Sequence, residues 1–256
     1  MGGRGADRLM GERVRAASDS ELLRVDRLTT SFAVDGRRLV AVRDVSLVVR
    51  SGEAVGLVGE SGSGKSTLGR TILRLLEPDA GEVWFDGFQL STLRGRSLRA
   101  IRQRMSVVFQ DPYASLDPSA TVERLLTEPL VVHRIGQNRS DRRARARAAL
   151  REVGLPAEAL RRHPHAFSGG QRQRIGIARA LALDPTFLVL DEPVSALDVS
   201  VQAQILNLLA DLRTHHDLAY LFISHDLHVV GHLCDRIFVR YLRQTAESRP
   251  RDRALR

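Results

Sequence analysis

Cysteine and lysine are almost absent from this sequence. It holds one cysteine, Cys234, in 256 residues, and one lysine, Lys65, among 39 basic residues. A lone cysteine excludes an internal disulfide and a multi-cysteine zinc or iron–sulfur site, which favours a reducing, cytosolic compartment. No run approaches the ~20 apolar residues of a membrane-spanning helix. The charged first 20 residues also lack the apolar segment of a secretion signal.

The remaining composition is that of an average soluble protein, with 43% hydrophobic and 27% charged residues. It excludes a disordered chain and a collagen-like fibre. The net charge of +9 is uneven: residues 134–151 hold seven arginines and one aspartate, and residues 236–256 hold seven arginines and two acidic residues. Such patches can attract nucleic acid or an anionic membrane, but a solvated helix and a loose tail are the simpler interpretation.

Short apolar runs that are followed at once by polar residues recur along the chain. They are 54–58, 106–109, 187–190 and 220–223, followed by Gly59, Gln110, Asp191 and Ser224. Apolar runs that alternate with helical patterns predict an α/β fold with a mostly parallel sheet, which binds ligands beyond the carboxyl ends of its strands. Strand-like runs before residue 50 predict an antiparallel β subdomain, and helical patterns over 121–165 predict a small helical subdomain.

Residues 59–66 match the phosphate-loop pattern G-x-x-x-x-G-K-[ST] between a strand and a helix, which predicts a P-loop NTPase core. The candidate nucleotide-binding residues are Gly59, Glu60, Ser61, Gly62, Ser63, Gly64, Lys65, Ser66 and Thr67. The glycines let backbone N–H groups converge on phosphate, Lys65 supplies a compact ammonium, and Ser66 offers a hydroxyl to Mg²⁺. The alternative is a chance Gly/Ser loop, which the flanking strand and helix disfavour.

Two acidic residues follow the apolar run 187–190. Asp191 is placed to hold Mg²⁺ and Glu192 to polarise the attacking water. Alone, such a pair can equally cap a helix or bind an arginine. Together with the phosphate loop, it favours a nucleotide–metal site.

A second glycine-rich string, Ser168-Gly169-Gly170-Gln171, opens a predicted helix. Ser168 is a natural N-cap, and the glycines leave further backbone N–H groups accessible. The string is either a capped helix and nothing more, or a second anion site.

These strings resemble, in order and approximate spacing, the ATP-binding subunits of ABC transporters over about Leu22 to Val239. The strings 108–118, 167–175 and 192–200 are similar to the branch that energises dipeptide and oligopeptide import, although importers of nickel and other small solutes share them. The resemblance implies a peripheral subunit at the cytoplasmic face of the cell membrane that binds ATP with Mg²⁺. It would hydrolyse ATP to drive import of peptides or a related small solute.

The resemblance also implies that two such domains pair head to tail, with the Ser168–Gln171 loop of one covering the γ-phosphate held by Lys65 of the other. The second ATP-binding subunit would be a copy or a paralogue. Further partners would be membrane permease subunits and, indirectly, a solute-binding protein; nucleic acid is not expected.

Individual roles also follow from the resemblance. Phe32 would stack on adenine, Gln110 would contact Mg²⁺ and sense the membrane partner, and Asp198 would act across the dimer. His225 would contact the γ-phosphate and position the water, which makes Glu192, His225 and Gln110 the candidate catalytic residues. The candidate Mg²⁺ ligands are Ser66, Gln110 and Asp191. The alternatives are core packing for Phe32 and a structural histidine for His225.

We expect a mobile leader at residues 1–20, a nucleotide-binding domain at 21–239 with its helical subdomain at about 111–170, and a basic, shortened tail at 240–256. The tail departs from the family because it lacks an expected glycine, and Arg240 looks out of place in an apolar strand. The alternative function is a soluble ABC-type ATPase that acts on nucleic acid or ribosomes. A single cassette without heptad-repeat arms disfavours it.

Overall fold

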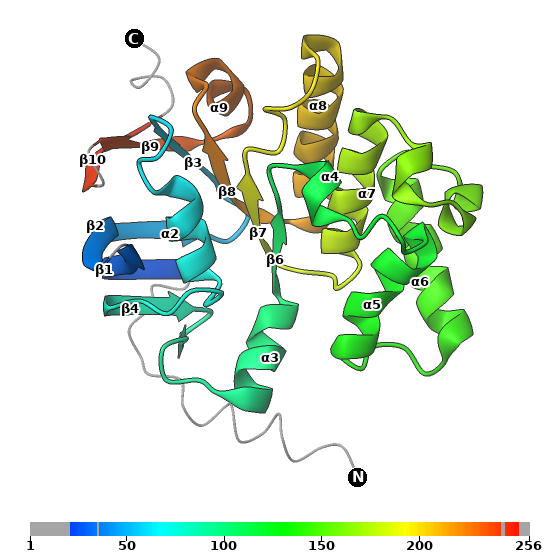
Figure 1. The fold of residues 1–256 in the computed structure, drawn as a ribbon, viewed down its shortest axis with the longest axis horizontal. Helices are drawn as coiled ribbons and strands as arrows, with labels where there is room; N and C mark the ends of the chain where they lie inside the picture. The colour runs from blue at the N-terminus through cyan, green and yellow to red at the C-terminus, as the bar shows by residue number, and fades with distance from the viewer. Residues whose placement is uncertain (1–20, 35, 242–243, 251–256) are drawn as a thin grey trace.

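The structure is a computed structural model that describes residues 21–34, 36–241 and 244–250. A central sheet has a second sheet on one side and a group of helices on the other (Figure 1). The predicted α/β class, with a mostly parallel sheet, an antiparallel sheet and a helical part, is confirmed. The leader expected at residues 1–20 lies outside the described residues.

Over the described residues, the central sheet has six strands in the order β10-β9-β3-β8-β7-β6. They are β3 (Ala54–Gly59), β6 (Met105–Val108), β7 (Phe187–Asp191), β8 (Ala219–Ser224), β9 (Arg236–Tyr241) and β10 (Gln244–Pro250). All neighbours are parallel except β10, which runs antiparallel to β9. The four predicted apolar strands are confirmed and adjoin one another, so the polar residues that follow them meet at one edge of the sheet.

The second sheet is antiparallel, in the order β2-β1-β4-β5. Its strands are β1 (Glu21–Val34), β2 (Arg37–Arg50), β4 (Ala80–Phe85) and β5 (Phe88–Gln89). The short runs expected before residue 50 belong to one long hairpin, whose register shifts at several points. Buried side chains of β1, such as Leu23 and Val25, pack in one core with Leu57 of β3 and Leu68 of the following helix. This core fixes the second sheet against the segment that carries the phosphate loop.

Helices cover both faces of the central sheet. They are α2 (Lys65–Ile72), α3 (Gly95–Gln103), α4 (Pro112–Ser115), α5 (Val122–Val132), α6 (Arg139–Glu152), α7 (Gly169–Leu181), α8 (Val199–His216) and α9 (Leu227–Leu233), with 3-10 turns at Ala157–Arg161 and Pro164–Ala166. Helices α4 to α7 pack together as the group drawn in green at the right of Figure 1. Their core, with Leu126, Leu150 and Ile175, continues to Leu188 and Tyr220 of the sheet.

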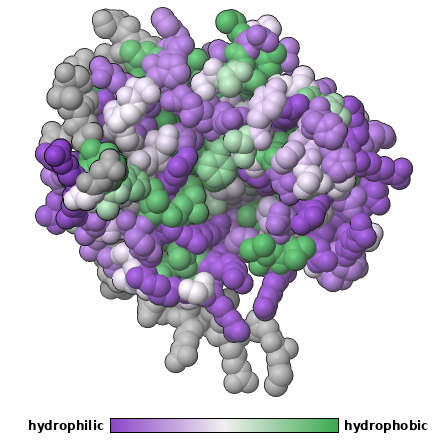
Figure 2. All heavy atoms as spheres, in the orientation of Figure 1, coloured by the Kyte–Doolittle hydropathy of each residue, from purple (hydrophilic) through white to green (hydrophobic). Residues whose placement is uncertain are grey.

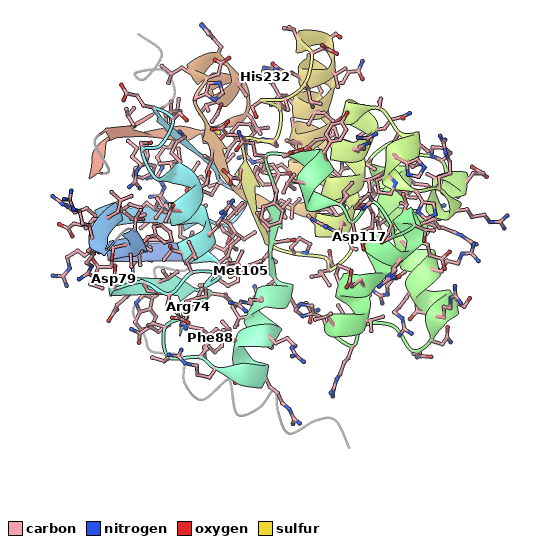
Figure 3. All side chains as sticks on the ribbon, viewed as in Figure 1. Arg74, Asp79, Phe88, Met105, Asp117 and His232 are labelled. Carbon is pink, nitrogen blue, oxygen red and sulfur yellow. The ribbon has the colours of Figure 1, made fainter. Side chains whose placement is uncertain are left out.

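Helix α8 is an element that the sequence analysis missed. Its buried residues Ile205, Leu206, Leu209 and Leu212 follow helical spacing, which is the signal that predicts it. The helical spacing of Leu68, Ile72, Leu75 and Leu76 predicts a helix through Leu76, but α2 is shorter. It ends at Ile72 because Arg74 has a left-handed φ of 56°. The buried guanidinium of Arg74 (Figure 3) donates to the carbonyl of Leu90 and pairs with Glu77.

Part of the tail expected from residue 240 belongs to the central sheet. Strand β9 runs through Arg240 to Tyr241, and Gln244–Pro250 pair with it as β10. The boundary therefore falls inside a strand. Arg240 fits this strand because its guanidinium donates to backbone carbonyls of two other segments, Ser63 and Ala41. Residues 251–256 of the tail lie outside the described residues.

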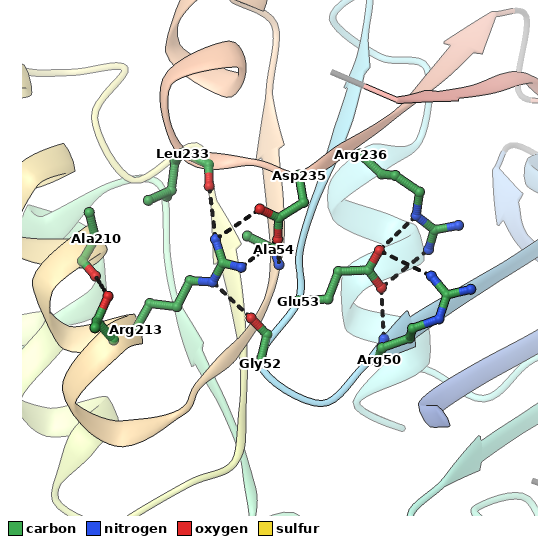
Figure 4. A network of polar contacts seen from close by, with 10 residues as sticks. Arg50, Gly52, Glu53, Ala54, Ala210, Arg213, Leu233, Asp235 and Arg236 are labelled. Atoms are coloured by element: carbon green, nitrogen blue, oxygen red, sulfur yellow. Dashed lines mark hydrogen bonds and ion pairs between the residues drawn. The ribbon is translucent and has the colours of Figure 1, made fainter. Parts of the chain in front are cut away.

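A network of charged residues ties together the amino ends of β3 and β9 (Figure 4). Arg236 donates to Glu53 at 2.7 Å, and Asp235 accepts from the backbone N–H of Ala54 at 2.9 Å. Arg213 of α8 donates to the carbonyl of Gly52 at 2.9 Å and pairs with Asp235. These contacts hold the strands at the end opposite to the phosphate loop.

The basic segment 134–151 is largely the solvated helix α6, as the simpler interpretation predicts. Arg139 and Arg143 both pair with Glu123 of α5, at 3.5 and 3.1 Å. Figure 2 shows a mostly hydrophilic face with separate apolar patches. Over the described residues, no helix has both the length and the apolar character that crossing a bilayer demands.

Candidate functional site

The phosphate loop connects β3, which ends at Gly59, to α2, which begins at Lys65. Gly62 and Gly64 have φ of 76° and 88°, the left-handed region that favours glycine. At Gly64 a Cβ would also collide with the carbonyl oxygen of Ala41. The loop conformation therefore depends on glycine at this position, as the sequence motif predicts.

Lys65 lies back across the loop that precedes it. Its Nζ donates to the carbonyl oxygens of Gly59 at 2.8 Å and Glu60 at 2.9 Å. The residue is only 4% exposed, and burial lowers the pKa of its ammonium. The charge is thus held at a fixed position beside the loop, where an incoming phosphate gains most from it.

Ser66, in the first turn of α2, contacts Asp191, the last residue of β7. Ser66 Oγ donates to Asp191 Oδ1 at 2.7 Å, and Asp191 is 3% exposed. Burial raises the pKa of the Asp191 carboxyl, and the hydrogen bond from Ser66 opposes that shift. A hydroxyl and a buried carboxylate are oxygen donors of the kind Mg²⁺ prefers. Within the described residues, there is no group of three His, Cys, Asp or Glu side chains that could hold a metal ion. The Ser66 hydroxyl and the Asp191 carboxylate fit Mg²⁺ by the chemistry of their oxygen atoms.

Glu192 follows β7 and receives side chains from both neighbouring strands. Its Oε2 accepts from Gln110 Nε2 at 3.1 Å, and His225 Nδ1 lies 3.3 Å from the same oxygen. The Glu192 backbone has a φ of 47°, and its N–H donates to the carbonyl of Ile223 at 3.0 Å. The three predicted catalytic residues are therefore brought together.

An open cavity of about 1050 Å³ lies over this cluster. Its lining residues are Phe32, Leu39, Ala41, Ser61, Gly62, Gly64, Lys65, Ser66, Thr67, Gln110, Asp111, Glu192, Ser195, Ala196 and His225. Phe32 is 37% exposed, so its ring faces the cavity and is not core packing. The sequence analysis missed Leu39, Ala41, Asp111, Ser195 and Ala196. Of these, Asp111 directly follows Gln110, and its position beyond a strand end is a usable signal.

The string 168–171 lies elsewhere in the chain. Ser168 Oγ accepts from the N–H of Gln171 at 3.3 Å, while Gln171 Oε1 accepts from the N–H of Ser168 at 3.1 Å, a complete capping box at the start of α7. A Cβ on Gly170 would collide with Val201 of α8, so this glycine lets the two helices approach. The predicted residues Ser168, Gly169, Gly170, Gln171 and Asp198 do not line the chain's own cavity. Asp198 is the N-cap residue of α8.

Residues 42–195 match a protein family described as ABC transporter. A Brucella ovis protein whose name assigns it to peptide import as an ATP-binding protein is 52% identical over 90% of this chain and 72% of its own. The oligopeptide transport ATP-binding protein OppF of Bacillus subtilis is 47% identical over 91% of this chain and 76% of its own. Among solved structures, a dimeric ATP-binding cassette in a post-hydrolysis state with ADP and phosphate superposes with a TM-score of 0.81 at 30% identity. That superposition covers 90% of this chain and 98% of the cassette.

The family match spans more than half of the chain, and the relatives match it nearly end to end. The family match and the similarity to these relatives agree with the phosphate loop. They also agree with the cluster of Gln110, Asp191, Glu192 and His225 at the carboxyl ends of the parallel strands. The chain belongs to the ABC transporter family, as one of its ATP-binding proteins.

Proposed function

We propose that this chain binds ATP with Mg²⁺ in the cavity over the phosphate loop and hydrolyses it to drive peptide import through membrane permease subunits. The observation that carries the ATPase assignment is the position of the Glu192 carboxylate, which Gln110 and His225 hold at the mouth of the phosphate loop. The peptide assignment is supported by the names of relatives that are about half identical to this chain.

The residues of the loop bind and orient the triphosphate. Backbone N–H groups between Gly59 and Gly64 converge on the phosphates, and Lys65 neutralises the β- and γ-phosphate charge. Ser66 Oγ and the Asp191 carboxylate would hold Mg²⁺. The ion, when bound, neutralises charge that develops on the phosphate oxygens. Phe32, which lines the same cavity, stacks on the adenine.

Glu192 acts as the general base. Its carboxylate accepts a proton from a water whose oxygen attacks the γ-phosphorus, while the bond from that phosphorus to the bridging oxygen of ADP breaks. The products are ADP and inorganic phosphate. Gln110 and His225 hold the carboxylate in one orientation, and His225 also contacts the γ-phosphate.

The head-to-tail dimer accounts for residues that lie away from the chain's own cavity. Ser168 is exposed at the amino end of α7, where helix N–H groups and the helix dipole favour an anion. We assign Ser168–Gln171 and Asp198 to the cavity of a second ATP-binding subunit, either a copy or a paralogue. Closing around ATP and reopening after hydrolysis then supplies the motion that the permease uses.

This proposal places the chain at the cytoplasmic face of the membrane, bound to permease subunits, with a solute-binding protein acting indirectly. It keeps residues 21–239 as the nucleotide-binding domain and about 111–170 as its helical subdomain. Strand β9, which runs to Tyr241, supports counting residues 240 and 241 with that domain.

The test is ATP hydrolysis by the chain assembled with its permease subunits in lipid vesicles, with and without peptide. We expect peptide to stimulate phosphate release and a Lys65→Ala variant to abolish it. A rate of ATP hydrolysis that does not change with permease or peptide, but increases when duplex nucleic acid is added, would overturn the transport assignment in favour of a soluble ATPase.

A further inference from the structure

Arg240 is the largest of the fully buried side chains in the described part of the chain, at 1% exposure. It lies on β9 opposite Gly59, the first glycine of the phosphate loop, in the parallel pairing of β9 with β3. Burial lowers the pKa of its guanidinium to about 10, so the group stays charged at neutral pH. A buried charge is costly unless it makes specific contacts, so what Arg240 contacts is informative.

The guanidinium of Arg240 links the phosphate loop to the second sheet. Nε donates to the carbonyl oxygen of Ser63 at 2.5 Å, and Nη2 donates to the carbonyl oxygen of Ala41 on β2 at 2.8 Å. A Cβ added to Gly64 would lie 3.2 Å from Nη2 and would collide with the carbonyl of Ala41. A Cβ added to Gly59 would collide with the carbonyl oxygen of Arg240 itself. Arg240 therefore lies against both ends of the phosphate loop, at its first glycine, Gly59, and at its last, Gly64.

The contact with Ser63 also fixes the direction of a loop amide. In a trans peptide the C=O of one residue and the N–H of the next point in opposite directions, and the described residues contain no cis peptide. Because the Ser63 carbonyl points to Arg240, the N–H of Gly64 points away from Arg240. Gly64 lines the cavity, whereas Ser63 and Arg240 do not. The Gly64 N–H is thus directed toward the side where phosphate binds.

We infer that Arg240 is a positioning residue for nucleotide binding, which holds the phosphate loop in its phosphate-binding conformation and ties it to β2. The inference rests on the proposed function, because it concerns the same ATP site. Strand β2 also carries Leu39 and Ala41, which line the cavity. The Arg240 side chain therefore connects the cavity wall to the phosphate loop.

The test compares Arg240→Met, Arg240→Lys and a control, Arg236→Met. Arg236 lies on the same strand, but its guanidinium binds Glu53 and the carbonyl of Val48 at the opposite end of the sheet. The readouts are the Kd of fluorescent ATP with Mg²⁺ and the hydrogen exchange of loop residues 59–67.

For Arg240→Met we expect Kd to rise about tenfold, the usual effect of losing a charged hydrogen bond, and loop exchange to increase. Arg240→Lys keeps one donor and should lie between Arg240→Met and wild type. It also decides the outcome if Arg240→Met does not fold. Arg236→Met should keep a wild-type Kd even though its melting temperature falls.

A wild-type Kd and unchanged loop exchange in Arg240→Met, or an equal loss of affinity in Arg236→Met, would overturn the positioning role. Wild-type protein and Lys65→Ala in the same series separate this result from failure of the proposed function. If wild-type protein does not bind ATP, or Lys65→Ala binds it equally well, then the ATP site itself is wrong.

Discussion

His225 and Glu192 lie side by side at the ends of two neighbouring strands, with Nδ1 of the histidine 3.3 Å from Oε2 of the glutamate. The same oxygen accepts a hydrogen bond from the side-chain amide of Gln110, which follows β6 on the other side of β7. The Glu192 carboxylate is thus oriented by residues that are 33 and 82 positions away in sequence. A base that must meet a single water molecule requires this kind of fixed orientation.

Lys65→Arg is expected to fail almost as completely as Lys65→Ala, although it keeps the positive charge. The ammonium fits between the carbonyls of Gly59 and Glu60, and a planar guanidinium does not. We expect ATP affinity to fall by about 100-fold or more in both variants, the scale of losing charge-assisted contacts. Equilibrium binding of labelled ATP measures it. Near-normal affinity in Lys65→Arg would show that only the charge matters.

Gly64→Ala and Gly62→Ala separate backbone strain from collision. Both residues have positive φ, but a Cβ at Gly62 meets no atom within 4 Å, whereas one at Gly64 meets the carbonyl of Ala41. Gly62→Ala should cost about 1 kcal/mol of unfolding free energy from strain alone. Gly64→Ala should cost about 3 kcal/mol or more and abolish ATP binding. Denaturant unfolding gives both values, and equal costs would contradict the close approach of Ala41.

Asp191→Asn should stabilise the nucleotide-free protein while weakening Mg²⁺-dependent ATP binding. Burial raises the pKa of Asp191, so the native state binds its proton more tightly than the unfolded state does. Stability is therefore lost as the pH rises from the ordinary aspartate range through the raised value. Asparagine stays neutral, and its oxygen can still accept from Ser66.

Melting temperatures of the wild type and Asp191→Asn, measured without nucleotide across the acidic and neutral range, check this linkage. The increase in melting temperature from Asp191→Asn should be largest at neutral pH. It should become smaller as the pH falls toward the ordinary aspartate pKa. A gain that does not change with pH would mean that the buried charge is not its source.

Ser168→Ala removes the capping box of α7 and should cost about 1 kcal/mol of stability. Asn138→Ala is a matched control, because Asn138 caps α6 by accepting from the N–H of Asp141 at 2.9 Å. Both variants should lose similar stability, but only Ser168→Ala should reduce ATP-dependent association of two subunits. Light scattering with ATP distinguishes them. Equal association in the two variants would remove Ser168 from the dimer site.

The phosphate loop and the strand-end cluster could be predicted from sequence because both depend on local patterns. A short apolar run followed by glycine or acid specifies a strand and its end, and parallel strands then gather these ends at one edge. Helix α8 was harder to recognise, because the outward residue Val199 is apolar and 82% exposed, which blurs the contrast between its two faces.

Arg240 could not be understood from its neighbours in sequence. A local pattern treats an arginine in an apolar strand as a misfit, since its hydrogen-bond acceptors, Ser63 and Ala41, are 177 and 199 residues away. Likewise, nothing near Leu76 shows that α2 stops at Ile72. The buried Arg74 that follows is held by the carbonyl of Leu90 beyond the next strand.

Hydrolysis and binding of ATP by Glu192→Gln, measured beside the wild type in the same samples with Mg²⁺, test the central claim most directly. Glutamine retains the shape and an oxygen for Gln110 but cannot take up a proton from water. We predict that both proteins bind ATP with similar affinity. The variant should release phosphate more slowly than the wild type by a factor of about 100 or more. Equal turnover in the two proteins, or no ATP binding by either, would contradict the account.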